Sequence, residues 1–154
     1  MIRTIYFEAG AVCILNQNQL PARVEYERIF SHQELAQAIK QLKVRGAPLI
    51  GVAAAYGLAL AVINYSGTRD NLAIYSREAE RLFASTRPTA VNLFWAINRM
   101  NSVFESYQHE DIESLRKRLL HEAQSICDED LATNKLIGEW GQALLPPDGR
   151  IMTI

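Results

Sequence analysis

The sequence has 154 residues and a mass of 17.4 kDa, which suits one domain with a sizeable core better than two full domains. Its apolar fraction of 49%, its charged fraction of 21% and its 8 glycines and 5 prolines exclude a disordered, collagen-like or low-complexity chain. The 16 basic residues and 17 acidic residues give a net charge of -1, so no basic surface for nucleic acid is expected.

The cysteines and the first residues indicate a cytoplasmic protein. Cys13 and Cys127 lie far apart in the sequence and match no metal-ligand spacing, so we expect two reduced thiols. The segment 1–6 lacks the apolar core of a signal peptide. The uncharged stretch 47–63 is too short and too rich in alanine to span a membrane, and it predicts a helix buried on all sides.

Three short apolar runs near the N-terminus predict a small antiparallel sheet. Residues 3–7 and 11–15 are joined by a turn that ends at Gly10, which supplies the positive φ of a tight hairpin. The third run, 24–30, follows the turn-prone segment 16–21.

From Ser31 onward the apolar spacing becomes helical. Ser31 and Glu34 match a capping box, in which each residue satisfies a free amide of the first helical turn. Pro48 marks the start of the second helix, because a missing amide costs least at that position.

Apolar repeats then predict three further helices, over about 72–85, 91–107 and 110–145. Pro88 disfavours helical geometry at the residue before it, and Thr89 is expected to cap the helix that follows. The predicted fold class is therefore α+β and mainly helical, with a small N-terminal antiparallel sheet followed by a helical bundle.

The last nine residues do not fit the bundle. Residues 146–149, Pro-Pro-Asp-Gly, are a strong turn signal, and 150–154 have the pattern of a strand. A lone strand has nothing to pair with. We therefore assign 1–145 to the N-terminal domain and 146–154 to the turn and first strand of a truncated C-terminal α/β domain.

The segment around Arg45 is the most informative for chemistry. Arg45 stands three residues before Pro48, and the first helical turn after it is expected to leave the amides of residues 49–51 free for an anion. Gly46 would let a phosphate approach the backbone, and Arg45 would add a charge-assisted bond. The alternative is that Arg45 is a surface or ion-pair residue and Gly46-Ala47 a plain turn, since every helix has such an end.

A second arginine repeats this layout. Arg87 directly precedes Pro88 at the start of a predicted helix, so Arg45 and Arg87 together would clamp one phosphate. The alternative for Arg87 is an ordinary arginine in a surface turn.

No nucleophile with its base and no cluster of metal ligands is visible, so we assign no catalytic residue and no metal site. We expect the three histidines and the acidic run to be solvated, and the two tryptophans to be core or rim residues. These residues are His32, His109, His121, Asp128, Glu129, Asp130, Trp95 and Trp140.

Two segments nevertheless carry a specific resemblance. Val44-Arg45-Gly46-Ala47-Pro48 running into residues 51–57, and Arg87-Pro88-Thr89 running into residues 90–93, resemble S-methyl-5-thioribose-1-phosphate isomerases. The likeness covers essentially the whole chain, but only the N-terminal part of that family's enzyme, so the chain would end in the first strand of a missing Rossmann-like domain.

The resemblance implies a function and a set of site residues. The family converts 5-methylthioribose 1-phosphate into 5-methylthioribulose 1-phosphate in methionine salvage, without a metal or nucleotide cofactor, and its full-length members are expected to be homodimers. Arg45, Gly46 and Ala47 correspond to the first substrate-binding loop, and Arg87 to the second substrate-binding arginine. The expected partner is a small sugar phosphate, not nucleic acid or a membrane.

The chain departs from the family where the catalytic residues would lie. In the family the strand after the long helix continues into a Thr-His-Cys-Asn motif, whereas here Ile154 stands in place of the histidine. The catalytic cysteine and aspartate would lie beyond, so we expect no activity from this chain alone. Two alternatives remain: a non-catalytic regulatory subunit like those of initiation factor 2B, and a fragment of a ribose 1,5-bisphosphate isomerase. The motifs at Arg45 and Arg87 favour the methylthioribose-1-phosphate isomerase family over both alternatives.

Overall fold

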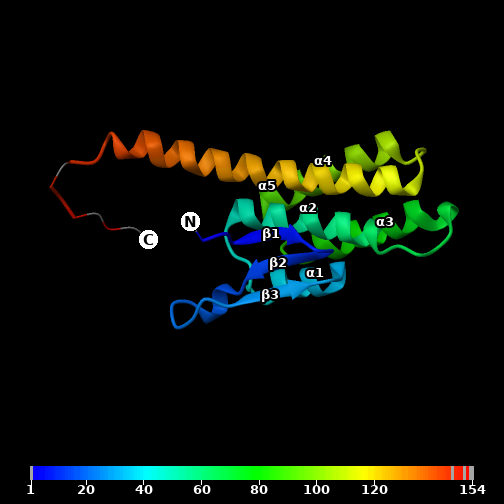
Figure 1. Ribbon diagram of the computed structural model, residues 1–154, viewed down its shortest axis with the longest axis horizontal. Coiled ribbons are helices and arrows are strands. Elements are labelled where there is room, and N and C mark those ends of the chain that lie inside the picture. Colours follow the sequence, from blue (N-terminus) through cyan, green and yellow to red (C-terminus); the bar gives the residue numbers. More distant parts are fainter. Residues whose placement is uncertain (1, 147, 151, 153–154) are drawn as a thin grey trace.

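A computed structural model describes residues 2–146, 148–150 and 152. These residues form a small sheet and five α-helices, which confirms the mainly helical fold with an N-terminal sheet (Figure 1). In chain order the elements are β1 (Ile5–Glu8), β2 (Ala11–Leu15), β3 (Tyr26–Ile29), α1 (His32–Lys40), α2 (Ala47–Ile63), α3 (Arg69–Ala84), α4 (Val91–Tyr107) and α5 (Ile112–Gln142).

The sheet is antiparallel, with the strands in the order β1-β2-β3. Ala9 and Gly10 turn the chain between β1 and β2 with φ values of 47° and 78°, the left-handed pair that matches the twist of a two-residue hairpin. The register pairs Ile5 with Ile14 and Val12 with Ile29, and all four are buried in the core. One face of the sheet thus closes the core against the helices.

Helix α1 begins with the predicted capping box. The Ser31 side chain accepts from the Glu34 amide at 3.2 Å, and the Glu34 carboxylate accepts from the Ser31 amide at 3.3 Å. These bonds satisfy two donors that a bare helix start would leave without partners.

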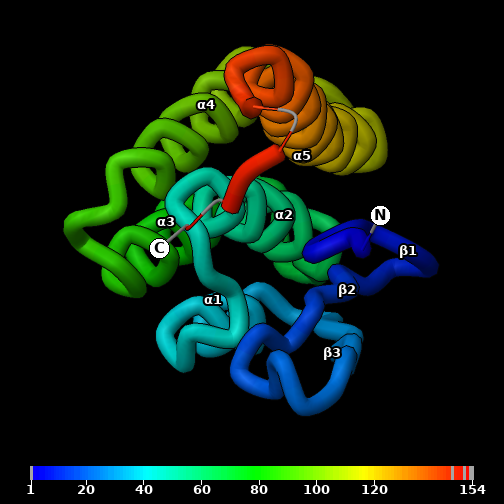
Figure 2. The backbone as a smooth tube through the Cα atoms, turned by 90° about the vertical axis from the view of Figure 1, so that its left-hand side faces the viewer, coloured from blue at the N-terminus to red at the C-terminus, as the bar shows by residue number. Residues whose placement is uncertain are grey.

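Helix α2 runs through the centre of the domain, as its apolar sequence predicts. All residues from Ile50 to Val62 are buried, and the helix contacts each of the other four helices and β1. Figure 2 views the domain nearly end-on and shows the other elements arranged around α2. No helix in the described part of the chain is both long and apolar enough to cross a membrane.

The start of α4 differs from the prediction. Ala90, not Thr89, is the N-cap, and no side chain caps this helix. The reason is the tight turn after α3: the Ala90 amide donates to the carbonyl of Arg87 at 3.0 Å, which places Thr89 inside the turn. The predicted end of α3 near Ser85 is confirmed.

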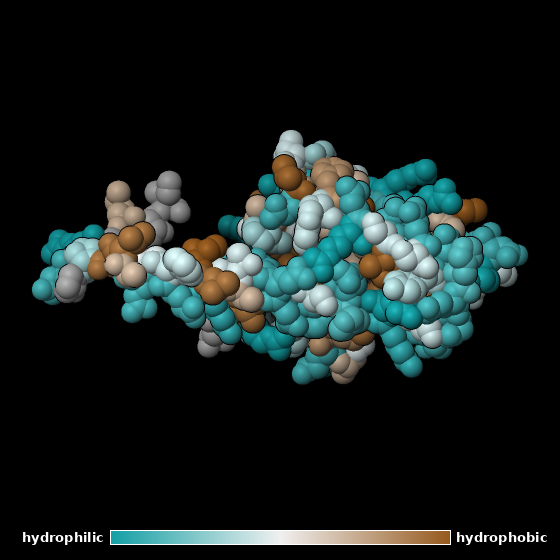
Figure 3. Space-filling view, turned by 90° about the horizontal axis from the view of Figure 1, so that it is seen from above, coloured by the Kyte–Doolittle hydropathy of each residue, from teal (hydrophilic) through white to brown (hydrophobic). Residues whose placement is uncertain are grey.

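Helix α5 extends beyond the rest of the domain (Figure 1). Its first half buries Leu115, Leu119, Ala123 and Ile126, whereas residues 131–140 are all exposed. Apolar side chains gather on this protruding half (Figure 3), namely Leu131, Leu136, Ile137 and Trp140. Trp140 is 77% exposed and so is not a core residue. Most of the strand predicted over 150–154, and Pro147 of the turn before it, lie outside the described residues.

One histidine is buried, contrary to the expectation that all three are solvated. His32, the first residue of α1, contacts the ring of Tyr75 in α3 edge-on, with ring centroids 5.6 Å apart. Its burial depends on the packing of α1 against α3, which the helical spacing alone does not reveal. Cys13 and Cys127 are both free thiols, as predicted.

Candidate functional site

The start of α2 has the backbone that the sequence suggested, but different amides are free. Gly46 is the N-cap with φ 105°, which L side chains rarely adopt. The Ile50 amide donates to the Gly46 carbonyl at 3.0 Å, so Ile50 and then Gly51 belong to the helical ladder and were wrongly predicted to be free. In the described part of the chain, the amides at this end that donate no hydrogen bond are those of Gly46, Ala47 and Leu49.

Arg45 is held beside this helix start by neutral groups. Its Nε donates to the carbonyl of Leu42 at 2.9 Å, and its Nη2 donates to the side-chain oxygen of Asn18. No acidic residue in the described ranges forms an ion pair with Arg45, so the ion-pair alternative is not supported. The Arg45 guanidinium thus faces no paired carboxylate, and its Nη1 is available to an external anion.

Arg45 and Gly46 share an open cavity of about 370 Å³. Residues near the N-terminus and from the start of α2 form most of its wall, and α5 contributes the rest. The other lining residues are Thr4, Leu15, Gln17, Leu20, Pro48, Leu49, Asp130 and Asn134. The structure thus brings Arg45 and Gly46 of the first predicted loop, but not Ala47, to a concave surface. That surface also contains the carboxylate of Asp130 from α5, which the sequence analysis did not assign to the site.

Arg87 lies in the turn between α3 and α4 and is half-buried. The start of α4, which follows Arg87, packs closely on the start of α2: a Cβ placed on Gly51 would lie 2.7 Å from the Asn92 carbonyl oxygen. Arg87 does not line the cavity that contains Arg45, so the two-arginine clamp stays a prediction.

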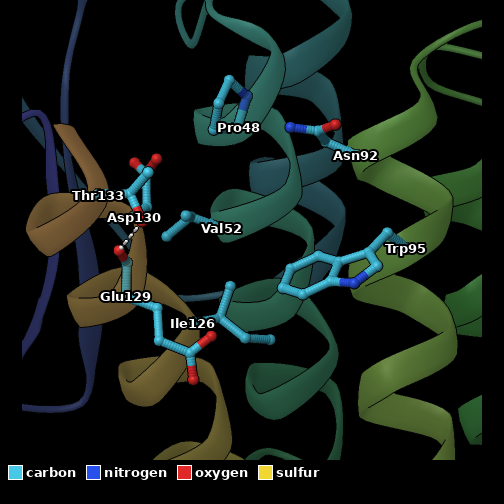
Figure 4. Close-up of a pocket in the computed structure, with 8 residues that line it drawn as sticks. All are labelled: Pro48, Val52, Asn92, Trp95, Ile126, Glu129, Asp130 and Thr133. Carbon is cyan, nitrogen blue, oxygen red and sulfur yellow. Dashed lines mark hydrogen bonds between the residues drawn. The ribbon is translucent and has the colours of Figure 1, made fainter. Parts of the chain in front are cut away.

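A second cavity, of about 410 Å³, adjoins the first between α2, α4 and α5 (Figure 4). Pro48 and Asp130 line both cavities. The Trp95 ring projects from α4 toward Ile126 and Val52. The remaining lining residues are Asn92, Glu129 and Thr133. Trp95 belongs to α4 and Asp130 to α5, so no local spacing in the sequence links them. The sequence analysis therefore did not predict this cavity.

One arginine pairs with two carboxylates beside Trp95. Arg99 donates to both carboxylate oxygens of Glu129, at 2.6 and 2.7 Å, and also pairs with Glu122. The hydrogen bonds from Arg99 lower the pKa of Glu129, and those to Glu129 raise the pKa of Arg99. The Arg99 guanidinium also lies 5.3 Å from the Trp95 ring centroid, which stabilises the ring orientation.

Cys127 lines a third neighbouring cavity, of about 510 Å³, and not the one that contains Arg45. Burial raises the pKa of its thiol, so the reactive thiolate is disfavoured at neutral pH. The nearby Tyr56 hydroxyl donates to the side chain of Gln124 at 2.7 Å. Across the described ranges, no three His, Cys, Asp or Glu side chains lie together in a way that would hold a metal ion.

With this geometry established, comparison with known proteins decides the family. Residues 43–154 match the initiation factor 2 subunit family. The chain belongs to this family. The chain is similar to a methylthioribose-1-phosphate isomerase from Syntrophomonas wolfei, with 53% identity over 154 residues, which are 100% of this chain and 44% of that protein.

Two solved structures have the same fold over the length of this chain that they match. The 5-methylthioribose 1-phosphate isomerase of Pyrococcus horikoshii superposes with a TM-score of 0.89 at 36% identity, over 95% of this chain and 41% of its own. The eIF-2B delta subunit of A. fulgidus superposes with a TM-score of 0.84 at 38% identity, over 94% of this chain and 42% of its own. The chain thus spans less than half the length of these relatives and corresponds to their N-terminal portion.

Proposed function

We propose that this chain forms the sugar phosphate-binding part of a methylthioribose-1-phosphate isomerase, which converts the aldose 1-phosphate into the ketose 1-phosphate in methionine salvage. The observation that carries the proposal is the shared cavity of Arg45 and Gly46 at the start of α2. It occurs in a chain that aligns over its whole length with a relative of that name. Arg45, Gly46 and Ala47 form the first binding loop in this proposal, and Arg87 contributes the second arginine.

The helix start suits a phosphate group for two reasons. The amides of Ala47 and Leu49 are donors at the positive end of the α2 dipole, which favours an anion. Arg45 adds a positive charge, and its bonds to Leu42 and Asn18 fix the orientation of the guanidinium. Because Gly46 has no side chain, phosphate oxygens can come within hydrogen-bond distance of the backbone.

The same residues support binding but not the isomerisation step. Moving a hydrogen between the first two carbons of the sugar needs an acid–base group within hydrogen-bond distance of those carbons. Cys13 is buried in β2, and Cys127 lines a different cavity from Arg45. We therefore expect no turnover from this chain alone, and no requirement for a metal or nucleotide cofactor.

Chemical-shift titration with methylthioribose 1-phosphate tests the binding proposal. We expect shifts at the amides of Gly46, Ala47 and Leu49, and a Kd of about 1 mM, because one arginine-supported anion site gives roughly -4 kcal/mol. Arg45→Ala is expected to weaken binding about tenfold or more, since it removes a charge-assisted bond. Arg45→Lys, which keeps the charge but not the planar fork, should give an intermediate Kd.

The matched control is Arg23→Ala. The Arg23 side chain is 69% exposed, and within the described residues its one ion pair is with Glu25, at 4.0 Å, so its removal should leave the Kd unchanged. A thermal melt of Arg45→Ala would separate lost binding from lost structure, because Arg45 also bonds Leu42 and Asn18. An unchanged Kd in a folded Arg45→Ala variant would refute the proposed site.

A second candidate is a non-catalytic binding subunit, favoured by the 38% identity to the A. fulgidus eIF-2B delta subunit. That candidate predicts no binding of methylthioribose 1-phosphate at the α2 start. A ribose 1,5-bisphosphate isomerase fragment would instead bind ribose 1,5-bisphosphate more tightly. Parallel titrations with the two sugar phosphates distinguish all three.

A further inference from the structure

The cavity between α2, α4 and α5 presents an apolar surface beside the phosphate-binding end of α2. Pro48, Val52, Trp95 and Ile126 form its apolar wall. Trp95 is 50% exposed, which leaves much of a large aromatic ring open at a concave surface (Figure 4). A partly enclosed apolar cavity with a few polar groups is the usual form of a small-molecule site.

Three polar side chains of this cavity have partners within the protein, whereas the Asn92 side chain, which also lines it, has none among the described residues. The Glu129 carboxylate is held by Arg99 through two bonds, and the Thr133 hydroxyl donates to the Glu129 carbonyl at 2.8 Å. The Asp130 carboxylate accepts from Asn134 at 3.0 Å. Because these three groups are already hydrogen-bonded, an apolar ligand group can lie beside them without leaving them unsatisfied.

The two cavities lie next to each other along α2, so one sugar phosphate could occupy both. Pro48 and Asp130 line both, and along α2 the step from Ala47 to Val52 is roughly 7.5 Å. In a pentose with a phosphate at one end and an apolar substituent at the other, one sugar ring separates the two groups. If the phosphate of such a ligand binds at the α2 start, the apolar substituent at its other end lies toward Val52 and Trp95.

We infer that the cavity lined by Trp95 is the subsite for the thioether end of the substrate, with Trp95 as the residue that selects methylthio over hydroxyl. The inference rests on the proposed function, which supplies the phosphate position. Sulfur beside an aromatic ring is a favourable contact, and burial of a methyl group adds to it. A hydroxyl in the same place would make neither contact, and its removal from water carries a cost.

The test compares two ligands that differ only at this end. Methylthioribose 1-phosphate and ribose 1-phosphate are titrated separately by chemical shift into the full chain. We expect the methylthio compound to bind at least about fivefold more tightly, from burial of the thioether and its methyl group. In Trp95→Ala the ratio of the two Kd values should fall to about one, with the Kd of ribose 1-phosphate changed by less than about twofold. Trp95→Phe keeps an aromatic face and should restore most of the ratio.

Fluorescence gives a direct readout of contact. The chain has two tryptophans, so Trp140→Phe, on the exposed half of α5, leaves Trp95 as the only one. We expect methylthioribose 1-phosphate to shift the Trp95 emission to shorter wavelength, and ribose 1-phosphate to shift it far less at equal occupancy. Equal shifts by the two compounds would overturn the inference.

The failures of the two proposals are distinguishable. Equal affinity of the native chain for both compounds, an unchanged ratio in Trp95→Ala, or loss of both ligands in a folded Trp95→Ala variant each overturns the thioether subsite alone. Binding that Arg45→Ala does not weaken overturns the phosphate site. If neither compound binds the native chain, both proposals fall.

Discussion

Gly51 in α2 lies directly against the backbone of Asn92 in α4. A Cβ built on Gly51 would be 2.7 Å from the Asn92 carbonyl oxygen and 3.5 Å from the Cβ of Ala96. The contact holds the starts of the two helices together and so sets the geometry of the candidate site.

Gly51→Ala should therefore destabilise the domain. Alanine is the better helix former, but its methyl group would meet a backbone carbonyl that cannot rotate away. We expect a loss of about 1–3 kcal/mol in the free energy of unfolding, typical of overpacking, measured by urea denaturation. The control is Gly138→Ala, in the exposed half of α5, where a Cβ meets nothing within 4 Å. That change should be neutral or stabilise by up to about 1 kcal/mol, and equal effects of the two would contradict the packing argument.

The local signals in the sequence are the ones that the structure reproduces. Ser31 with Glu34, and Pro48 with the apolar run after it, specify helix starts through bonds within a few residues, so α1 and α2 follow from sequence. Thr89 matched a capping pattern too, but the tight turn after α3 shifts the cap to Ala90.

The candidate site likewise combines residues that the sequence places together with residues that only the packing of the helices brings together. Arg45 and Gly46 sit on one continuous segment, so the sequence indicates their neighbourhood. Trp95 and Asp130 come from different helices, and only the packing of α4 and α5 on either side of α2 brings them to one cavity. The burial of His32 likewise depends on Tyr75, far along the chain.

The burial of His32 makes stability depend on pH. Burial lowers the pKa of His32 below its usual value of 6.5, so the folded state favours the neutral ring. As pH falls through about 6.5, the unfolded chain binds a proton that the folded chain does not, and the free energy of unfolding decreases. The decrease should end once pH is below the folded-state pKa.

Urea denaturation at pH 7.5 and pH 5.5 measures this effect. The native chain should lose more stability between the two values than His32→Gln, whereas His109→Gln should behave like the native chain. The comparison between variants is needed because burial raises the pKa of Glu80, which stabilises the fold as pH falls. Identical pH dependence of the native chain and His32→Gln would contradict the assignment.

The capping box of α1 should contribute measurably to stability. Ser31→Ala removes the acceptor for the Glu34 amide and should cost about 1 kcal/mol in the free energy of unfolding. Ser102→Ala is the control, because the Ser102 hydroxyl only donates to the Asn98 carbonyl on the exposed face of α4. A loss for Ser102→Ala as large as for Ser31→Ala would argue against a specific capping role.

The two halves of α5 should differ in protection from hydrogen exchange. The first half packs its apolar face on the domain, whereas residues 131–140 are all exposed. Because an isolated helix of this length is marginal in water, we expect amide protection to drop sharply after Asp130 in native-state exchange measured by NMR. Uniform protection along the helix would show that the protruding half is stabilised in some other way.

A chimaera tests the proposal that this chain supplies the substrate-binding part of an isomerase. The aligned 44% of the Syntrophomonas wolfei protein would be replaced by this chain, and turnover of methylthioribose 1-phosphate measured. We expect turnover by the chimaera, none by this chain alone, and a loss of about tenfold or more in kcat/KM for Arg45→Ala, equivalent to roughly 1.4 kcal/mol. A folded chimaera without turnover, or one whose kcat/KM is unaffected by Arg45→Ala, would contradict it.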